Sequence, residues 1–305
     1  MPLSILRNDI TKMKVDAIVN AANTRLQMGG GVCGAIFYAA GPPKLSAACD
    51  KLAPIKNGEA VVTQGFALPA KYVIHTAGPV YKGGNYNEEN ELRACYRNAL
   101  ERAKENNCTS IAFPLISSGI FGYPKDKALA VATGTIAGWL LNNESDMDVS
   151  IVVFDKTSFM LPQKLLAGVK AFIDENYIRS CETPEAVQST SESFSQSLLR
   201  LIDVKGKKGA EVTRRANVKG GLFGKICDER DYTPGKAAVI AFAIALELSF
   251  EDACDLLARA GYTFSRSDVS DVIIQYFLTN GKYDIYEINN VLFEYDQPIL
   301  GGGVF

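Results

Sequence analysis

The sequence predicts an α/β domain built on a mostly parallel sheet, followed by an all-α C-terminal bundle. Three observations lead to this fold class. Strand-like and helix-like segments alternate through the first half of the chain, a polar stretch follows, and the remainder has an almost wholly helical pattern. Alternation of this kind implies a sheet that helices cover on both faces.

Short β-branched and apolar runs predict the strands of the first part, and longer amphipathic segments predict its helices. A first strand precedes Asp9. The further expected strands span residues 15–19, 61–66, 72–75, 110–115 and 149–154, and the expected helices span 87–106, 125–141 and 162–173. Ligands of such sheets bind at the carboxyl ends of the strands, so the loops after the strands are the expected place of a site.

A flexible linker is predicted at residues 180–196, which are rich in Ser, Thr and Glu and have almost no apolar periodicity. It separates a first domain at 1–179 from a helical domain at 197–305. The expected helices of the second domain span 210–216, 234–248, 251–260 and 268–278, after an apolar face of Leu198, Leu199 and Ile202. Ser249 and Ser267 are the expected caps of the last two helices.

Composition places the chain among ordinary globular proteins. Its 305 residues are enough for two domains, and 47% of them are hydrophobic and 22% charged. The formal net charge of −2 gives no global attraction to nucleic acid or to an anionic membrane.

Cysteine usage indicates a reducing compartment. The seven cysteines contain no C-x-x-C pair, so we expect no zinc site, and they lie at positions 33, 49, 95, 108, 181, 227 and 254. Charged residues interrupt the N-terminal segment, and no run reaches about 18 apolar residues. We therefore expect a soluble cytoplasmic protein without a membrane segment and without a metal or cofactor.

The segment 20–41, NAANTRLQMGGGVCGAIFYAAG, is the most informative part of the chain. It places an amide side chain and the glycines Gly29, Gly30 and Gly31 between a strand and a helix expected to begin near Val32. Glycine lets a ligand approach the main chain closely, and a helix N-terminus favours an anion. The alternative for three bare glycines is a flexible turn, because neither the Walker pattern nor the Rossmann pattern fits.

Four motifs in order carry a resemblance to a known family. The motifs are NAAN, GGGV, IHTAGP at 74–79 and ISSGIFGYP at 116–124, and together they resemble a macrodomain, the ADP-ribose-binding α/β module. The resemblance covers roughly residues 1–179. It implies a three-layer α/β fold with a mixed, mostly parallel sheet and a crevice for ADP-ribose.

The resemblance assigns roles at the two ends of the ligand. Asp9 matches the carboxylate that accepts a hydrogen bond from the adenine amine, Ile10 supplies a neighbouring contact, and Phe154 matches the aromatic beside the adenine. Core packing is the alternative for Phe154. Asn23 matches the amide that holds the distal ribose, whereas we expect Asn20 to bond the backbone and shape the loop.

Two loops are expected to hold the pyrophosphate on backbone N–H groups. The first wall is Gly29, Gly30, Gly31, Val32 and Cys33, and the second is Ser117, Ser118, Gly119, Ile120 and Phe121. Neither loop contains Lys or Arg. Asn23, Gly31 and Phe121 are the residues that the resemblance places at the reacting ribose.

The implied chemistry is hydrolysis at the anomeric carbon of the distal ribose, or deacetylation of O-acetyl-ADP-ribose. In one hydrolase branch Asp follows GGGV and His lies four positions later, but this chain has Cys33 and Phe37 there. Cys33 is either a small residue lining the site or a thiolate nucleophile. His75, the single histidine, is expected to be structural.

The helical domain has its own resemblance. Residues 209–225 resemble the helix-turn-helix of phage-repressor-like DNA-binding proteins, with a turn at Asn217 and Val218 and a second helix containing Leu222, Phe223 and Ile226. Residues 200–225 hold eight Lys or Arg against two acids, a local charge of +6, which would attract phosphates. Gly220, Gly221 and Gly224 weaken the second helix, and base-edge readers are few. A protein-interaction or purely structural role is the alternative.

Three functions follow as hypotheses. The first is an ADP-ribosyl hydrolase acting on mono-ADP-ribosylated protein or on O-acetyl-ADP-ribose. The second is a reader that binds ADP-ribose without turnover. The third is a regulator that senses an ADP-ribose metabolite and binds DNA through its helical domain.

Overall fold

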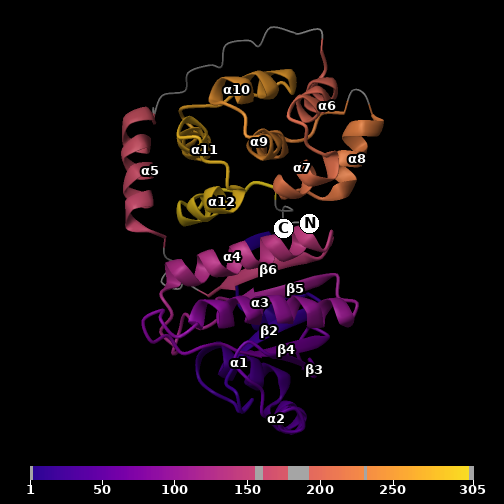
Figure 1. The fold of residues 1–305 in the computed structure, drawn as a ribbon, viewed down its shortest axis with the longest axis vertical. Helices are drawn as coiled ribbons and strands as arrows, with labels where there is room; N and C mark the ends of the chain where they lie inside the picture. Colours follow the sequence, from indigo (N-terminus) through magenta and orange to yellow (C-terminus); the bar gives the residue numbers. More distant parts are fainter. Residues whose placement is uncertain (1–2, 155–160, 178–191, 230–231, 302–305) are drawn as a thin grey trace. The chain divides into compact units, whose positions relative to one another are not determined.

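Two compact units make up the chain. The computed structural model describes residues 3–154, 161–177, 192–229 and 232–301. Contacts within the chain separate Leu3–Met160 from the part that begins at Leu161. Each unit is described by itself (Figure 1).

The first unit is built on a six-stranded sheet in the order β1-β6-β5-β2-β4-β3. Only β3 is antiparallel to its neighbour, so the sheet is mixed and mostly parallel, as expected. Each expected strand overlaps an observed one. The strands are β1 (Leu3–Arg7), β2 (Ala17–Ala22), β3 (Ala60–Gln64), β4 (Tyr72–Ala77), β5 (Ser110–Pro114) and β6 (Asp148–Val153).

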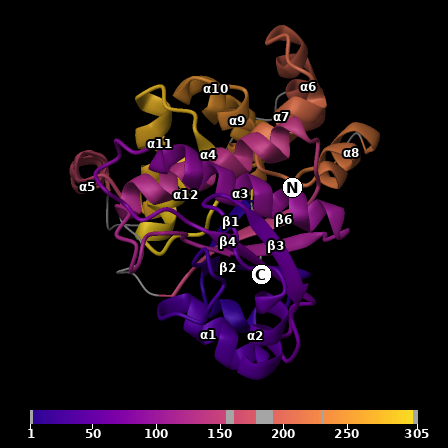
Figure 2. The same cartoon turned by 60° about the horizontal axis from the view of Figure 1, so that its bottom comes forward.

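Helices cover both faces of this sheet. Figures 1 and 2 show the sheet between α1 (Gly31–Ala40) and α2 (Pro42–Asp50) on one side and α3 (Glu88–Glu105) and α4 (Lys125–Asn142) on the other. A short 3-10 helix, η1 (Ile10–Lys12), follows β1. Helix α2 was not predicted from the sequence. It begins with two prolines, and proline suits the first turn of a helix.

The core on the α1 side forms where alternate strand residues meet the helices. Ile18, Val73, Ala112 and Val152 come from four neighbouring strands. They belong to one buried cluster with Ile36 and Phe37 of α1 and Leu45 of α2, and all seven are at most 5% exposed. Burial on this face fixes α1 against the sheet, which matters because α1 begins at the predicted site.

The described residues of the second unit form helices and no strand. The helices are α5 (Gln163–Asn176), α6 (Phe194–Val204), α7 (Gly209–Arg215), α8 (Gly220–Asp228), α9 (Lys236–Ala245), α10 (Phe250–Arg259), α11 (Val269–Thr279) and α12 (Ile285–Glu294). α9 is buried over most of its length, as expected of a central helix, and α12 was not predicted. No described helix combines the length and the apolar character that a membrane crossing requires.

The units divide after residue 160, whereas the first domain was predicted to end at residue 179. The difference is α5, which packs on α11 of the second unit. A Cβ at Gly168 would lie 2.7 Å from the Tyr276 hydroxyl, and the Phe172 and Tyr276 rings are 5.6 Å apart. An amphipathic pattern shows that a helix has a buried face but does not show which domain covers it.

Two local predictions in the second unit need correction. Of the expected linker, residues 180–191 lie outside the described residues, but 194–196 form the first turn of α6 instead. Ser193 and Gln196 make a reciprocal capping box that starts this helix, and Phe194 is 2% exposed. Ser249 caps α10 as expected, whereas Asp268, not Ser267, caps α11 by accepting from the Ser270 N–H at 2.8 Å.

The predicted pair of helices at 209–225 is present as α7 and α8, with Asn217 at φ 55° in the turn between them. Phe223 of α8 lies against the start of α7, where a Cβ on Gly209 would be 2.5 Å from its ring. The glycines of α8 therefore do not prevent the helix. DNA binding by α7 and α8 as a helix-turn-helix stays a prediction.

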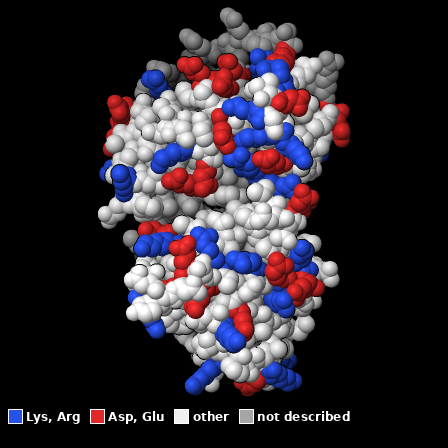
Figure 3. All heavy atoms as spheres, in the orientation of Figure 1, with Lys and Arg blue, Asp and Glu red and all other residues white. Residues whose placement is uncertain are grey.

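Several Lys and Arg side chains of the predicted basic patch form ion pairs within the unit. Lys207 donates to the Ala245 carbonyl at 3.0 Å and pairs with Glu247 at 3.2 Å, and Arg215 pairs with the same Glu247 oxygen at 2.5 Å. Arg200 pairs with Glu192 at 3.0 Å. Figure 3 shows acidic side chains among the basic ones on the visible face of this unit. Lys207 caps the end of α9, and all three side chains pair with carboxylates, which lowers the positive charge left for a phosphate backbone.

We expect Asp16→Ala to lower the free energy of unfolding of the first unit by about 2–3 kcal/mol, the usual loss for hydrogen bonds to a charged group. The Asp16 carboxylate joins the starts of three strands by accepting from Lys71 Nζ and from the Thr109 N–H and Oγ1, all at 2.8 Å. These bonds lower its pKa well below the usual 3.8. The stabilisation is therefore complete above pH 4 and disappears as the pH falls towards the lowered folded-state pKa.

Trp139, the single tryptophan, lies in α4 of the same unit, so denaturant titrations followed by its fluorescence measure this loss. Asp50→Ala, an exposed carboxylate on α2, is the matched control. Equal stability of the Asp16 variant and the wild type at pH 7 would contradict the prediction.

Candidate functional site

The candidate site lies where the parallel strands β2, β4, β5 and β6 end. Ala22 of β2 is paired with Ala77 of β4, and β5 is parallel to both β2 and β6. The loops that follow these strands therefore leave the same edge of the sheet. This is the edge at which ligands of open α/β sheets bind.

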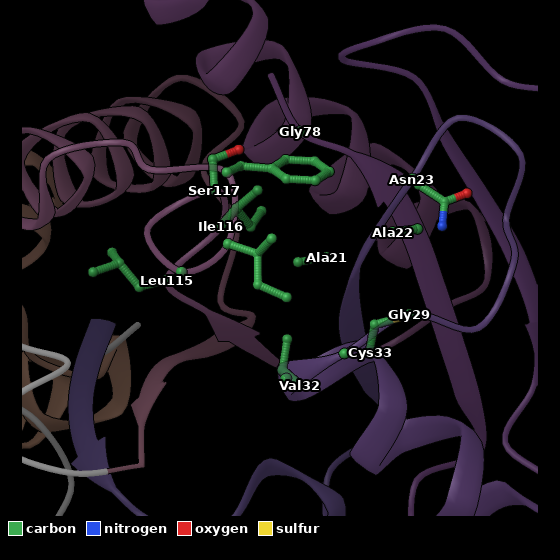
Figure 4. A pocket seen from close by; sticks show the side chains of 15 residues that line it. Ala21, Ala22, Asn23, Gly29, Val32, Cys33, Gly78, Leu115, Ile116 and Ser117 are labelled. Carbon is green, nitrogen blue, oxygen red and sulfur yellow. The ribbon is translucent and has the colours of Figure 1, made fainter. Parts of the chain in front are cut away.

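A first cavity of about 180 Å³ lies between the loops after β2, β4 and β5. Figure 4 shows Val32, Cys33 and Gly29 on one side, Ser117, Ile116 and Gly78 on the other, and Asn23 at the rim. The residues that line it are Ala21, Ala22, Asn23, Gly29, Gly30, Gly31, Val32, Cys33, Gly78, Leu115, Ile116, Ser117, Gly119, Ile120 and Phe121.

A second cavity of about 460 Å³ adjoins the first and shares Gly31, Val32, Leu115 and Gly119 with it. The other residues that line it are Asn8, Asp9, Ile10, Ala35, Pro114, Ser118, Val152, Val153 and Phe154. The two cavities form one crevice along the carboxyl edge of the sheet. In this crevice the first cavity corresponds to the expected distal ribose end and the second to the expected adenine end.

All the site residues predicted from the sequence line one of these cavities. In the first lie Asn23, Gly29, Gly30, Gly31, Val32, Cys33, Ser117, Gly119, Ile120 and Phe121, and in the second lie Asp9, Ile10, Ser118 and Phe154. Their roles towards a ligand stay predictions. Sequence reasoning missed Gly78, although it belongs to the quoted IHTAGP motif. A Cβ there would lie 2.3 Å from Ser117 Oγ, so only glycine fits.

Backbone geometry explains the glycines of the first loop. Gly31 begins α1 at φ 62°, in the left-handed region that favours glycine. A Cβ on Gly34, in the first turn of α1, would lie 2.7 Å from the Gly29 carbonyl oxygen. The loop thus packs tightly on the start of α1. A flexible turn, the alternative interpretation of the three glycines, would not need such close contacts.

The lining is almost free of charge. Among the described residues that line the two cavities, Asp9 is the one charged side chain. An anion in this crevice would meet backbone N–H groups and the N-terminal end of α1 rather than Lys or Arg. This agrees with a pyrophosphate held by the main chain.

The Asn23 amide organises its own loop. Its Nδ2 donates to the Gln27 carbonyl at 2.8 Å, and its Oδ1 accepts from the N–H groups of Arg25 and Gln27 at 3.0 and 3.2 Å. An amide nitrogen carries two N–H donors, so the second donor is available for a ligand hydroxyl. The bonds hold the side chain at the rim of the first cavity.

Asn20 differs from its expected role, because it bonds side chains rather than the backbone. It is fully buried, and its Nδ2 donates to His75 Nδ1 at 3.0 Å and to Cys33 Sγ at 3.6 Å. His75 therefore carries its proton on Nε2, which lies 2.9 Å from Thr63 Oγ1. Parallel pairing of β2 and β4 places Asn20 directly beside His75, a contact that the sequence motifs alone did not indicate.

This network bears on the thiolate alternative for Cys33. Burial lowers the pKa of His75 to about 4, so its imidazole is neutral at neutral pH and gives no positive charge to a thiolate. The Asn20 amide, which cannot take up a proton, lies between the histidine and the Cys33 sulfur. The geometry favours the lining role for Cys33 and the structural role for His75.

Asp9 is held as an ionised acceptor at the far end of the crevice. Its Oδ1 accepts from the Thr11 hydroxyl at 2.7 Å and from the Thr11 N–H at 3.0 Å, and Lys12 lies 3.7 Å from Oδ2. These bonds lower the pKa of Asp9. Phe154, on the same cavity, is 75% exposed, which removes core packing as its explanation.

The fold and the crevice define an α/β module with a candidate ligand site at the carboxyl edge of its sheet. The family model described as "Macro domain" matches residues 19–132. A macro domain-containing protein of Chlorobaculum tepidum is 49% identical over 163 residues, 53% of this chain and 94% of that protein. The chain therefore belongs to the macro domain family through its first part.

Two further relatives carry names that describe activities. The O-acetyl-ADP-ribose deacetylase of Cronobacter turicensis is 44% identical over 54% of this chain and 95% of its own length. The ADP-ribose glycohydrolase MACROD2 of Mus musculus is 47% identical over 53% of this chain, but the match covers only 34% of MACROD2. The family model ends at residue 132, before the helical unit.

We expect Asp9→Ala to weaken ADP-ribose binding about 5- to 150-fold, since a lost hydrogen bond to a charged group is worth about 1–3 kcal/mol. Inosine diphosphate ribose lacks the adenine amine, so the variant should bind it with nearly wild-type affinity. Isothermal titration calorimetry of both ligands on both proteins measures the difference. Equal losses for the two ligands would place Asp9 away from the amine.

Proposed function

We propose that this protein is an ADP-ribosyl hydrolase that removes ADP-ribose from mono-ADP-ribosylated protein or deacetylates O-acetyl-ADP-ribose. One observation carries the proposal. A single crevice joins a cavity with an ionised acceptor at Asp9 to a cavity with an amide at Asn23, and the tight glycine loop lies between them. An acceptor, a glycine loop and an amide follow one another along the crevice, and this order suits adenine, pyrophosphate and distal ribose. Relatives in the family are named for acting on such compounds.

The lining of the first cavity indicates the linkage to be cleaved. None of the described residues that line it is Asp, Glu, His, Lys or Arg, so the protein offers no strong general acid there. A carboxylate leaves without protonation because its conjugate acid has a pKa of about 4, whereas a guanidine, which is far more basic, needs a proton to leave. The site therefore suits an ester of ADP-ribose with an acidic side chain or with acetate.

Attack by water requires a held ribose and a positioned nucleophile. Asn23 holds the distal ribose, and the backbone N–H groups of the two glycine-containing loops hold the pyrophosphate close to it. On the protein-linked ester, water then attacks the anomeric carbon, the bond from that carbon to the ester oxygen breaks, and the carboxylate departs with the electron pair. On O-acetyl-ADP-ribose, water attacks the acetyl carbonyl carbon instead, the bond from that carbon to the ribose oxygen breaks, and the ribose oxygen takes a proton. With no carboxylate in this cavity, a pyrophosphate oxygen of the substrate is the group that takes the water proton.

Time courses of ADP-ribose release from a carboxylate-modified protein, and of acetate release from O-acetyl-ADP-ribose, test this proposal. Wild type should turn over at least one substrate, and Asn23→Ala should reduce kcat/KM about 10- to 100-fold through loss of ribose positioning. Binding of ADP-ribose without any turnover by wild type would instead establish the reader, the alternative that Cys33 in place of the usual Asp suggests.

Cys33→Ser should leave turnover within about 3-fold of wild type, because serine keeps the donor and acceptor that face Gln27 and Asn20. Pre-treatment with iodoacetamide adds a second measurement, since Cys33 is 5% exposed and should react slowly in the folded protein. Complete loss of activity in Cys33→Ser, with ADP-ribose binding intact, would instead identify a thiolate nucleophile.

A further inference from the structure

We propose that Tyr96, a fully buried residue of α3, is a positioning residue for the pyrophosphate of the ligand. Its hydroxyl holds the start of the loop after β5, residues 115–123, and this loop forms one wall of the first cavity. The inference rests on the proposed function, because that function supplies the ligand. It deepens the proposal by naming the side chain that keeps the backbone donors of this wall in place.

The loop after β5 has backbone donors that no protein group uses. Four of its N–H groups donate to no acceptor in the described part of the chain, and they belong to Ser117, Gly119, Ile120 and Phe121. All four residues line the first cavity. Since a backbone N–H needs an acceptor from protein, water or ligand, these donors suit anionic oxygens, provided that the loop holds them in a fixed position.

The Ile116 N–H, at the start of the same loop, is bonded to Tyr96. It donates to the Tyr96 hydroxyl at 3.0 Å, and the Tyr96 ring lies 5.3 Å from the ring of Phe113 in β5. Burial raises the pKa of Tyr96, so the hydroxyl is neutral at neutral pH and accepts this bond without a charge. Tyr96 thus packs on the strand through its ring and fixes the loop through its oxygen.

The residue before Tyr96 holds the opposite wall. Cys95 Sγ donates to the carbonyl of Ala77, the last residue of β4, at 3.3 Å, and Gly78 follows. One turn of α3 therefore sets the separation between the ends of β4 and β5. That separation is small, because a Cβ on Gly78 would lie 2.3 Å from Ser117 Oγ.

Beyond the Tyr96 bond, the loop is closed by its own backbone. The Tyr123 N–H donates to the Ser117 carbonyl at 3.0 Å, and the Gly122 N–H donates to the Gly119 carbonyl at 2.9 Å. Ser117 has φ 64°, in the left-handed region that favours glycine. Such a conformation persists only where the surroundings fix it, and the Tyr96 bond fixes the residue directly before it.

Tyr96→Phe tests the role, since it removes the hydroxyl and keeps the buried ring. The Ile116 N–H is then left in the core without an acceptor, so the loop shifts and its free donors lose their alignment. The variant should bind ADP-ribose about 5- to 30-fold more weakly, and adenosine, which has no pyrophosphate, within about 2-fold of wild type. Isothermal titration calorimetry measures the Kd of ADP-ribose, and ligand-observed NMR measures that of adenosine.

The matched control is Tyr72→Phe, which removes a hydroxyl at the start of β4, the end of the strand away from Gly78, and should leave both Kd values unchanged. Denaturant titration followed by Trp139 fluorescence checks that both variants fold. Equal weakening of ADP-ribose and adenosine by Tyr96→Phe would show a purely structural role and overturn the proposal.

The outcomes separate this role from the hydrolase. Unchanged ADP-ribose binding by Tyr96→Phe would refute the positioning role even if hydrolysis were established. Binding by wild type without turnover, with the selective loss in Tyr96→Phe intact, would refute the hydrolase and support the positioning role. A wild type that binds no ADP-ribose would refute both.

Discussion

Close approach of backbone segments sets the geometry of the crevice. The Gly29 peptide lies against the first turn of α1 where Gly34 has no Cβ, and Gly78 leaves room for Ser117 on the opposite wall. The first contact depends on the position of α1, which the buried cluster on that face of the sheet holds through Ile36 and Phe37. Shape and main-chain donors, rather than charged side chains, therefore determine what the crevice accepts.

Much of this arrangement was predictable from the sequence. Apolar runs and helical periodicity predicted the strands and most helices, because burial imposes those patterns on the chain directly. The three glycines before a helix indicated a loop for an anion, and the resemblance of four motifs to macrodomains supplied Asp9, Asn23, Phe154 and the second loop. Because the parallel strands end at one edge of the sheet, all of these residues lie together along the crevice.

Long-range packing accounts for what the sequence did not predict. The Asn20–His75–Thr63 bonds depend on which strands are neighbours, and a local pattern does not carry that information. The packing of α5 on α11 depends on the fit of Gly168 to Tyr276, which are far apart in the chain. From the sequence, Lys207 and Arg215 counted as unpaired positive charges, whereas in the fold both pair with Glu247.

The neutral histidine and the ionised Asp9 have a consequence for control by acidity. Burial keeps the His75 pKa near 4, and the Thr11 bonds keep that of Asp9 below its usual value, so both side chains hold one protonation state from about pH 5 upward. Neither the core beneath α1 nor the Asp9 end of the crevice then responds to ordinary shifts in cellular pH. Occupancy of the crevice would follow ligand concentration instead.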